Sequence, residues 1–218
     1  MKDKKYFGSI SFGSITAIIV FFTALAVFSI IAHEVVTEKE DWFDSRVFAF
    51  LNNYSTNFSI QLFRVFTFFG SGTFLFPAYA IILAWLFYKH RKTDAIDIAL
   101  LAITSSLLLH VLKISFARHR PELPLLTDSN TYSFPSGHTL SSFVFLSILL
   151  WKLWQSDIAS KWRWTITILF VLLFLAIGVS RIILRYHYAS DVLAGFSLGV
   201  AYVLLFFWLR NIWRRNKL

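Results

Sequence analysis

The sequence predicts an all-α protein, a bundle of six membrane-spanning helices, and two observations support this fold class. First, 57% of the 218 residues are hydrophobic and only 15% are charged, whereas about one quarter of the residues in soluble domains are charged. Second, the apolar residues gather in six long runs, most of them close to the roughly 20 residues that cross a bilayer. We therefore expect a single integral-membrane domain over residues 1–218.

Each apolar run is predicted to be a helix, because unpaired backbone polar groups are costly in lipid. The first run is too long for the apolar region of a signal peptide, typically about 7–15 residues, so we expect a retained first helix. The fourth and fifth runs are short, and we expect their ends to lie inside the membrane boundary. The six runs are Ile10–Ala32, Val65–Tyr88, Ala95–Leu112, Leu140–Trp154, Trp164–Val179 and Val192–Leu209.

The segment between the first two runs, His33–Arg64, is polar and aromatic. Within it, Trp42–Phe50 mixes aromatic and charged residues, which is typical of a helix lying in the membrane interface. A plain extracytoplasmic loop is the alternative.

The distribution of charge predicts the orientation. Thirteen of the 21 basic residues lie on the side that carries both termini, and this bias places both termini in the cytoplasm of a multi-pass plasma-membrane protein. The net charge is +9, but the basic residues cluster beside apolar spans rather than on one soluble face. Nucleic acid is therefore not an expected partner. The absence of cysteine excludes disulfides and a cysteine nucleophile.

Three polar stretches are expected to meet on the extracytoplasmic side. They are Lys113–Pro121 (KISFARHRP), Pro135–His138 (PSGH) and Ser180–Asp191 (SRIILRYHYASD). Taken singly, the first is typical of an interfacial anchor, and the second of a turn with a helix N-cap. Together they bring cations, histidines, a glycine turn and a carboxylate to one membrane face.

This inventory fits a phosphate site. Arginine and lysine bind phosphate oxygens, and the backbone N–H groups of Ser136 and Gly137, at a helix start, form a natural anion site. His187 and Asp191 are four residues apart, so they share a helical face if the last helix begins by Tyr186. The aspartate can then orient the imidazole.

The three stretches resemble the signature of the type 2 phosphatidic acid phosphatase (PAP2) family. Its pattern, K-x6-R-P, P-S-G-H and S-R-x5-H-x3-D, is matched at every fixed position. The sequence looks most like the bacterial phosphatidylglycerophosphate and undecaprenyl-diphosphate phosphatases. The resemblance implies a six-helix lipid phosphatase that works without metal or other cofactor.

The resemblance also implies a role for each matching residue. His187 would be the nucleophile, Asp191 its orienting carboxylate, and His138 the general acid. The residues that hold the phosphate would be Lys113, Arg120, Ser136, Gly137 and Arg181. Arg118 stands at a variable position of the first motif, and we interpret it as a charge without a role in the site.

The implied partners are a lipid phosphate substrate and membrane lipids, with no obligate protein partner. Phosphatidylglycerol phosphate, undecaprenyl diphosphate and phosphatidic acid remain open as substrates. A phosphotransferase using the same phosphohistidine is the first alternative. A transporter is a more distant one, because the charges gather at one face and no span carries a mid-helix charge. A lipid-binding protein with a decayed site is disfavoured because every motif position is filled.

Overall fold

The computed structural model describes residues 12–37, 42–121 and 131–215, and this part of the chain is helical, as predicted. It forms α1 (Phe12–Thr37), α2 (Trp42–Asn52), α3 (Asn57–Phe68), α4 (Gly72–Tyr88), α5 (Lys92–Phe116), α6 (Gly137–Trp154), α7 (Ser160–Ile183) and α8 (Ala189–Arg215).

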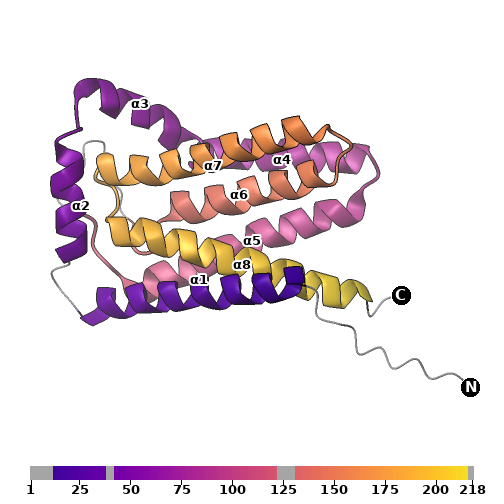
Figure 1. Ribbon diagram of the computed structural model, residues 1–218, viewed down its shortest axis with the longest axis horizontal. Helices are drawn as coiled ribbons and strands as arrows, with labels where there is room; N and C mark the ends of the chain where they lie inside the picture. Colours follow the sequence, from indigo (N-terminus) through magenta and orange to yellow (C-terminus); the bar gives the residue numbers. More distant parts are fainter. Residues whose placement is uncertain (1–11, 38–41, 122–130, 216–218) are drawn as a thin grey trace, which may run out of the picture.

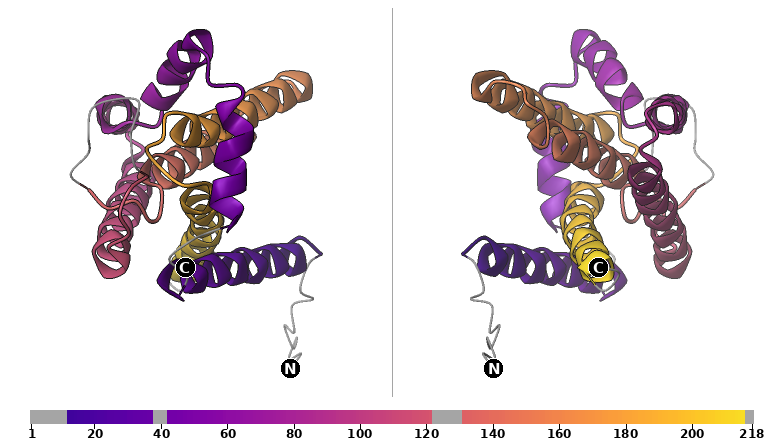
Figure 2. Two further views of the ribbon diagram at one scale, coloured as in Figure 1. Left: turned by 90° about the vertical axis from the view of Figure 1, so that its left-hand side faces the viewer. Right: turned by 90° about the vertical axis from the view of Figure 1, so that its right-hand side faces the viewer.

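The long helices run side by side, and α2 crosses one end of them (Figure 1). The start of α1 and the end of α8 both point toward the opposite end of the molecule (Figure 1), but they are well separated in the end views (Figure 2). Seen from the α2 end, α2 passes in front of the ends of α7 and α8, which it contacts (Figure 2). Of the two structures predicted for Trp42–Phe50, the helix is therefore the one that forms.

The second predicted helix, Val65–Tyr88, is interrupted. The chain leaves α3 after Phe68 and starts α4 at Gly72, with Ser71 in an extended N-cap conformation. Gly70 lies in this break, packed so closely that a Cβ atom there would stand 2.8 Å from Ile177 Cγ2 and 3.3 Å from His138 Cβ. A glycine is thus required for the break to pack against α6 and α7.

Within the part of the chain that the structure describes, five segments are long and apolar enough to cross a membrane: Ile15–Thr37, Asn57–Tyr88, Lys92–Phe116, Ser160–Ile183 and Ala189–Arg215. The fourth predicted span forms a helix, α6, but does not belong to this group. α6 packs against α5, α7 and α8, and Thr139 and Ser142 are buried on it. A helix that faces other helices rather than lipid tolerates such polar residues, which explains its weaker apolar character.

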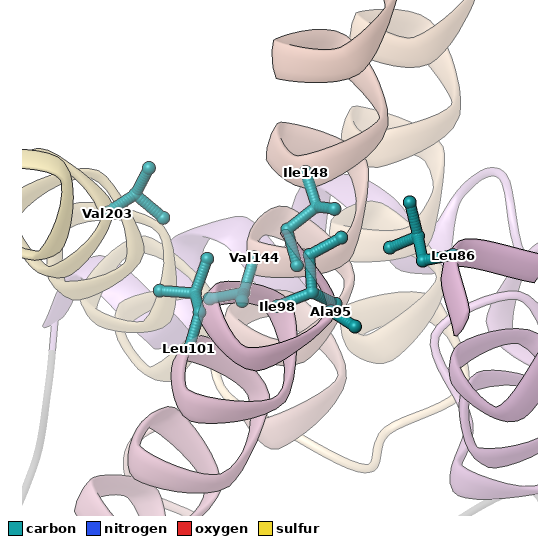
Figure 3. Packing of buried hydrophobic residues seen from close by; sticks show 7 residues of the cluster. All are labelled: Leu86, Ala95, Ile98, Leu101, Val144, Ile148 and Val203. Carbon is teal, nitrogen blue, oxygen red and sulfur yellow. The ribbon is translucent and has the colours of Figure 1, made fainter. Parts of the chain in front are cut away.

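One apolar cluster ties four of the helices together. It joins side chains of α4, α5, α6 and α8, namely Leu86, Ala95, Ile98, Leu101, Val144, Ile148 and Val203 (Figure 3). A second group packs α1 onto this bundle, with Phe28 stacked on the buried Phe134 at 5.9 Å between ring centroids. Of the two groups, the second lies beside a polar motif, because Phe134 directly precedes Pro135–His138.

Candidate active site

The predicted site residues meet at the end of the bundle that α2 crosses. Lys113 lies in the last turn of α5 and Arg181 in the last turn of α7. His138 lies in the first turn of α6 and Asp191 in the first turn of α8. His138 is close enough to Arg181, His187, Arg120 and Lys113 to interact with each of them electrostatically.

His187 and Asp191 are paired, but not along one helical face. α8 begins only at Ala189, so His187 precedes the helix, and the condition for a shared helical face, a helix that begins by Tyr186, is not met. His187 Nδ1 nevertheless lies 3.4 Å from Asp191 Oδ2. Both side chains are almost completely buried, with relative exposures of 2% and 0%.

Asp191 is held by donors on both of its oxygens. Oδ2 accepts hydrogen bonds from the Ser133 hydroxyl and, at 2.9 Å, from the backbone N–H of Tyr188. The Tyr188 bond is half of a capping box, in which the third helical residue reaches back to the N-cap. Oδ1 accepts from Arg118 Nη1 at 2.8 Å. These contacts aim Oδ2 at His187 and stabilise the carboxylate as an anion.

The environment of His187 favours a neutral imidazole. Complete burial lowers the pKa of His187 to about 3, although the Asp191 carboxylate opposes this shift. With the Nδ1 proton directed at Asp191, the lone pair of Nε2 is available on the other side of the ring. Arg120 Nη1 lies 3.4 Å from that Nε2 atom. The ring thus presents a nucleophilic nitrogen next to a cation.

Arg120 is fixed by main-chain and side-chain oxygens. Its Nε and Nη2 donate to the carbonyl and hydroxyl oxygens of Thr131 at 2.7 and 2.8 Å, and its Nη1 donates to the Tyr186 carbonyl at 2.8 Å. These acceptors are neutral, so the bonds orient the guanidinium without cancelling its charge.

Arg181 is buried and only partly satisfied. Its Nη1 donates to the Thr67 hydroxyl on α3 at 2.7 Å, and its guanidinium lies 4.3 Å from the centre of the Tyr186 ring. Within the described residues, its Nε has no hydrogen-bond partner. A buried cationic donor without a partner is costly unless an anion binds there.

The start of α6 differs from the expectation in one detail. The backbone N–H of Ser136, expected to face an anion, donates instead to the Asp191 carbonyl at 3.0 Å. Gly137 faces α5, where an added Cβ would lie 3.2 Å from Leu109 and 3.8 Å from Lys113 Cε. Lys113 Nζ donates to the Tyr132 carbonyl. The turn and the lysine therefore adjoin. The Ser136 side chain is buried, and its hydroxyl accepts a hydrogen bond from the Thr139 hydroxyl at 3.0 Å.

Arg118 is the main residue that sequence analysis missed. Besides Asp191, it donates from Nη2 to Asp44 Oδ2 at 2.9 Å and to the Ser190 hydroxyl from Nη1 at 2.8 Å. Its guanidinium stacks on Tyr188, 4.0 Å from the ring centre. Burial works against its charge, but the two carboxylates outweigh burial and raise the pKa of Arg118. In the sequence, Arg118 stands at a variable position of the first motif, and no regular spacing links it to Asp44.

The donor set does not resemble a metal centre. Within the described residues, no three His, Asp or Glu side chains are grouped so as to hold a metal ion. The cations Lys113, Arg120 and Arg181 gather there instead, a composition suited to a multiply charged anion.

Comparison with known proteins places the chain in a family. The model of the PAP2 superfamily matches residues 94–215, more than half of the chain. The chain belongs to the PAP2 superfamily. The matched range covers α5 to α8 and all the predicted site residues, while α1 to α4 lie outside it.

Individual relatives agree with the PAP2 assignment. The chain is 33% identical over 149 residues to phosphatidylglycerophosphatase B of Bacillus subtilis (strain 168), covering 68% of this chain and 72% of that protein. It is 30% identical over 172 residues to the bacitracin transport permease protein BcrC of Bacillus licheniformis, covering 74% and 77%. The crystal structure of a transmembrane PAP2-type phosphatidylglycerolphosphate phosphatase from Bacillus subtilis superposes with a TM-score of 0.77 at 28% identity, covering 89% of this chain and 96% of that one.

Proposed function

We propose that this PAP2 protein is a membrane lipid phosphatase that works through a phosphohistidine and without a metal ion. The observation that carries the proposal is the setting of His187, between the Asp191 carboxylate at Nδ1 and the Arg120 guanidinium near Nε2. A neutral, oriented imidazole beside a cation is suited to attack a phosphoryl group.

The reaction proceeds in two steps. His187 Nε2 attacks phosphorus, the bond from phosphorus to the lipid or diphosphate oxygen breaks, and His138 donates a proton to that leaving oxygen. His138 then takes a proton from water, whose oxygen attacks phosphorus as the phosphorus–nitrogen bond breaks, releasing phosphate. Asp191 stabilises the positive charge that His187 acquires in the first step.

The phosphoryl oxygens are held by Lys113, Arg120 and Arg181, with the Ser136 hydroxyl and Gly137 at the start of α6. The Nε of Arg181, which has no hydrogen-bond partner among the described residues, supports a direct contact to an oxygen. Fixed cations replace the metal clamp of other phosphoryl-transfer sites by neutralising the charge that develops in the transition state.

Six segments cross the membrane, with α6 the central one, and the site opens at head-group depth on the extracytoplasmic face. Phosphatidylglycerol phosphate is supported by the name of the Bacillus subtilis relative and by that of the similar Bacillus subtilis crystal structure. Undecaprenyl diphosphate is supported by the proposed orientation, because it is met in the outer leaflet.

Phosphate release from a panel of lipid phosphates tests the function. We expect turnover of phosphatidylglycerol phosphate, undecaprenyl diphosphate or phosphatidic acid, ranked by kcat/KM, with full activity in excess EDTA and inhibition by vanadate. Activity that is lost on chelation and restored by magnesium would overturn the metal-free mechanism.

The same assay separates the alternatives. A phosphotransferase would pass the phosphoryl group to an acceptor lipid instead of releasing phosphate. Transport is suggested by the name of one relative. A transporter would move solute across a vesicle membrane without releasing phosphate. A lipid-binding protein with a decayed site would show neither solute movement nor phosphate release.

A further inference from the structure

Arg118 connects the site to a helix that lies outside the three motifs. Its guanidinium joins two buried carboxylates, with Nη1 2.8 Å from Asp191 Oδ1 and Nη2 2.9 Å from Asp44 Oδ2. The side chains of Asp191 and Asp44 are 0% and 3% exposed. Asp44 belongs to the first turn of α2, which crosses the end of the bundle (Figure 1).

Asp44 is also bonded to the first turn of α8, next to Asp191. Its Oδ1 accepts from the Ser190 backbone N–H at 2.8 Å, and its Oδ2 accepts from the Ser190 hydroxyl. Burial raises the pKa of Asp44, while these bonds and Arg118 oppose that shift. Three donors from Ser190 and Arg118 converge on the group, as they do on a carboxylate that accepts hydrogen bonds.

Apolar contacts hold α2 on the same segment. Phe48 meets Tyr188 edge-on, with ring centroids 5.8 Å apart, and Asn52 accepts a hydrogen bond from Arg185 at 2.9 Å. Arg185 has a φ of 56°, a left-handed conformation that costs energy in a residue other than glycine and needs support from its surroundings. The remaining packing places Val47, Phe48 and Leu51 against Ile182, Ala189 and Val192.

We propose that Arg118 and Asp44 are positioning residues for Asp191, and that α2 is therefore an integral part of the active site. The proposal rests on the proposed phosphatase function. Arg118 fixes the rotation of the Asp191 carboxylate by holding Oδ1, so that Oδ2 stays directed at His187. Asp44 in turn fixes Arg118 by accepting the hydrogen bond from its Nη2 atom.

The geometry separates this role from phosphate binding. Both outer nitrogens of Arg118 already donate to carboxylates, and its face is stacked on Tyr188. Substitutions at Arg118 or Asp44 should therefore lower kcat with little change in KM, whereas loss of a cation that binds the ground-state phosphate should raise KM.

The first test is Asp44→Asn, which keeps the shape of the side chain but removes its charge. We expect kcat to fall about tenfold with KM within about twofold, a typical magnitude for side chains in one ion-pair network. The same substitution made in an Arg118→Met background should change kcat by less than about twofold, because Asp44 acts through Arg118. Arg118→Lys, which can keep one of the two ion pairs, should retain more activity than Arg118→Met.

Asp97→Asn is the matched control. Asp97 is also a buried carboxylate between two arginines, with Oδ2 2.6 Å from Arg210 Nε and 2.5 Å from Arg214 Nη2, but it lies at the other end of the bundle, where α5 begins and α8 ends. The Asp97→Asn variant should lose about as much thermal stability as Asp44→Asn, but it should keep the kcat of the unsubstituted protein.

The outcomes are distinct. If the unsubstituted protein is active and Asp44→Asn has the same kcat, the proposal is overturned. Additive effects of Asp44→Asn and Arg118→Met on kcat overturn it as well, and so does a variant in which KM alone rises. A kcat that falls equally in Asp97→Asn also overturns it, by showing a general loss of stability. If neither the unsubstituted protein nor Asp97→Asn releases phosphate from any lipid, the proposed function fails, and this inference fails with it.

Discussion

His187 Nδ1 and Asp191 Oδ2 lie 3.4 Å apart across the start of α8, with the histidine before the helix and the aspartate in its first turn. The pair is set by the capping bond from the Tyr188 N–H to Asp191 rather than by a shared helical face. Because the loop carries the histidine, its ring can point between Asp191 and Arg120.

This arrangement predicts that His187→Ala lowers turnover by more than about a thousandfold while the protein still folds. Brief incubation with lipid carrying a radiolabelled phosphate should label the unsubstituted protein on His187. His110→Ala, at an exposed position of α5, serves as control and should label normally. Substantial turnover or labelling in His187→Ala would remove His187 from the role of nucleophile.

The buried histidine also predicts a pH-dependent stability. The folded-state pKa of His187 is lowered to about 3, whereas the unfolded chain binds a proton near pH 6.5. Between these values only the unfolded state is protonated, so stability is fully present above about pH 6.5 and is lost as the pH falls towards 3.

At pH 5 the loss attributable to His187 is about 2 kcal/mol. Thermal unfolding of detergent-solubilised protein at pH 7.5 and pH 5 measures it, with His187→Asn as the comparison. The asparagine variant should lose less stability between the two pH values. Equal losses in both proteins would show that His187 is not buried as a neutral group.

Gly70 predicts a steric effect on the general acid. In Gly70→Ala the new Cβ would lie 2.8 Å from Ile177 Cγ2 and 3.3 Å from His138, and Ile177 is only 1% exposed, so His138 or its neighbours must shift. We expect kcat to fall by about tenfold or more, because small displacements of a catalytic group are costly.

Gly72→Ala is the control for this experiment. Its Cβ would approach Phe76 Cε2 at 3.1 Å, but Phe76 is exposed and its ring can move aside. Near-normal kcat in Gly72→Ala together with a reduced value in Gly70→Ala supports the steric explanation, and equal values in the two variants contradict it.

The orientation can be tested by labelling single cysteines in this cysteine-free chain. Asn53 is exposed just after α2, at the end that carries the site, and Gln155 is exposed just after α6, at the opposite end. We expect an impermeant maleimide to label Asn53→Cys in intact cells, and Gln155→Cys only after lysis. The reverse pattern would place the site in the cytoplasm and change the accessible substrates.

Much of the architecture could be predicted from local sequence. Apolar runs specify helices in lipid because the backbone has no other way to satisfy its polar groups, and α1, α5, α7 and α8 follow the predicted runs. The break at Gly70 was not predicted, although Gly70, Ser71, Gly72 and Thr73 interrupt the apolar run there and are typical of a turn. Its close fit depends on tertiary structure, because Gly70 packs against Ile177 and His138, residues far away in the sequence.

The sequence by itself determined the chemical inventory of this protein: a membrane bundle, three polar motifs at one face, and residues suited to phosphate. Only the tertiary structure decided how these residues are oriented. The bond of Arg181 to Thr67 joins positions 114 apart, and that of Arg118 to Asp44 joins positions 74 apart. Such pairs obey no periodicity, since they depend on how α2 and α3 pack across the ends of α7 and α8, and packing is a property of the whole fold.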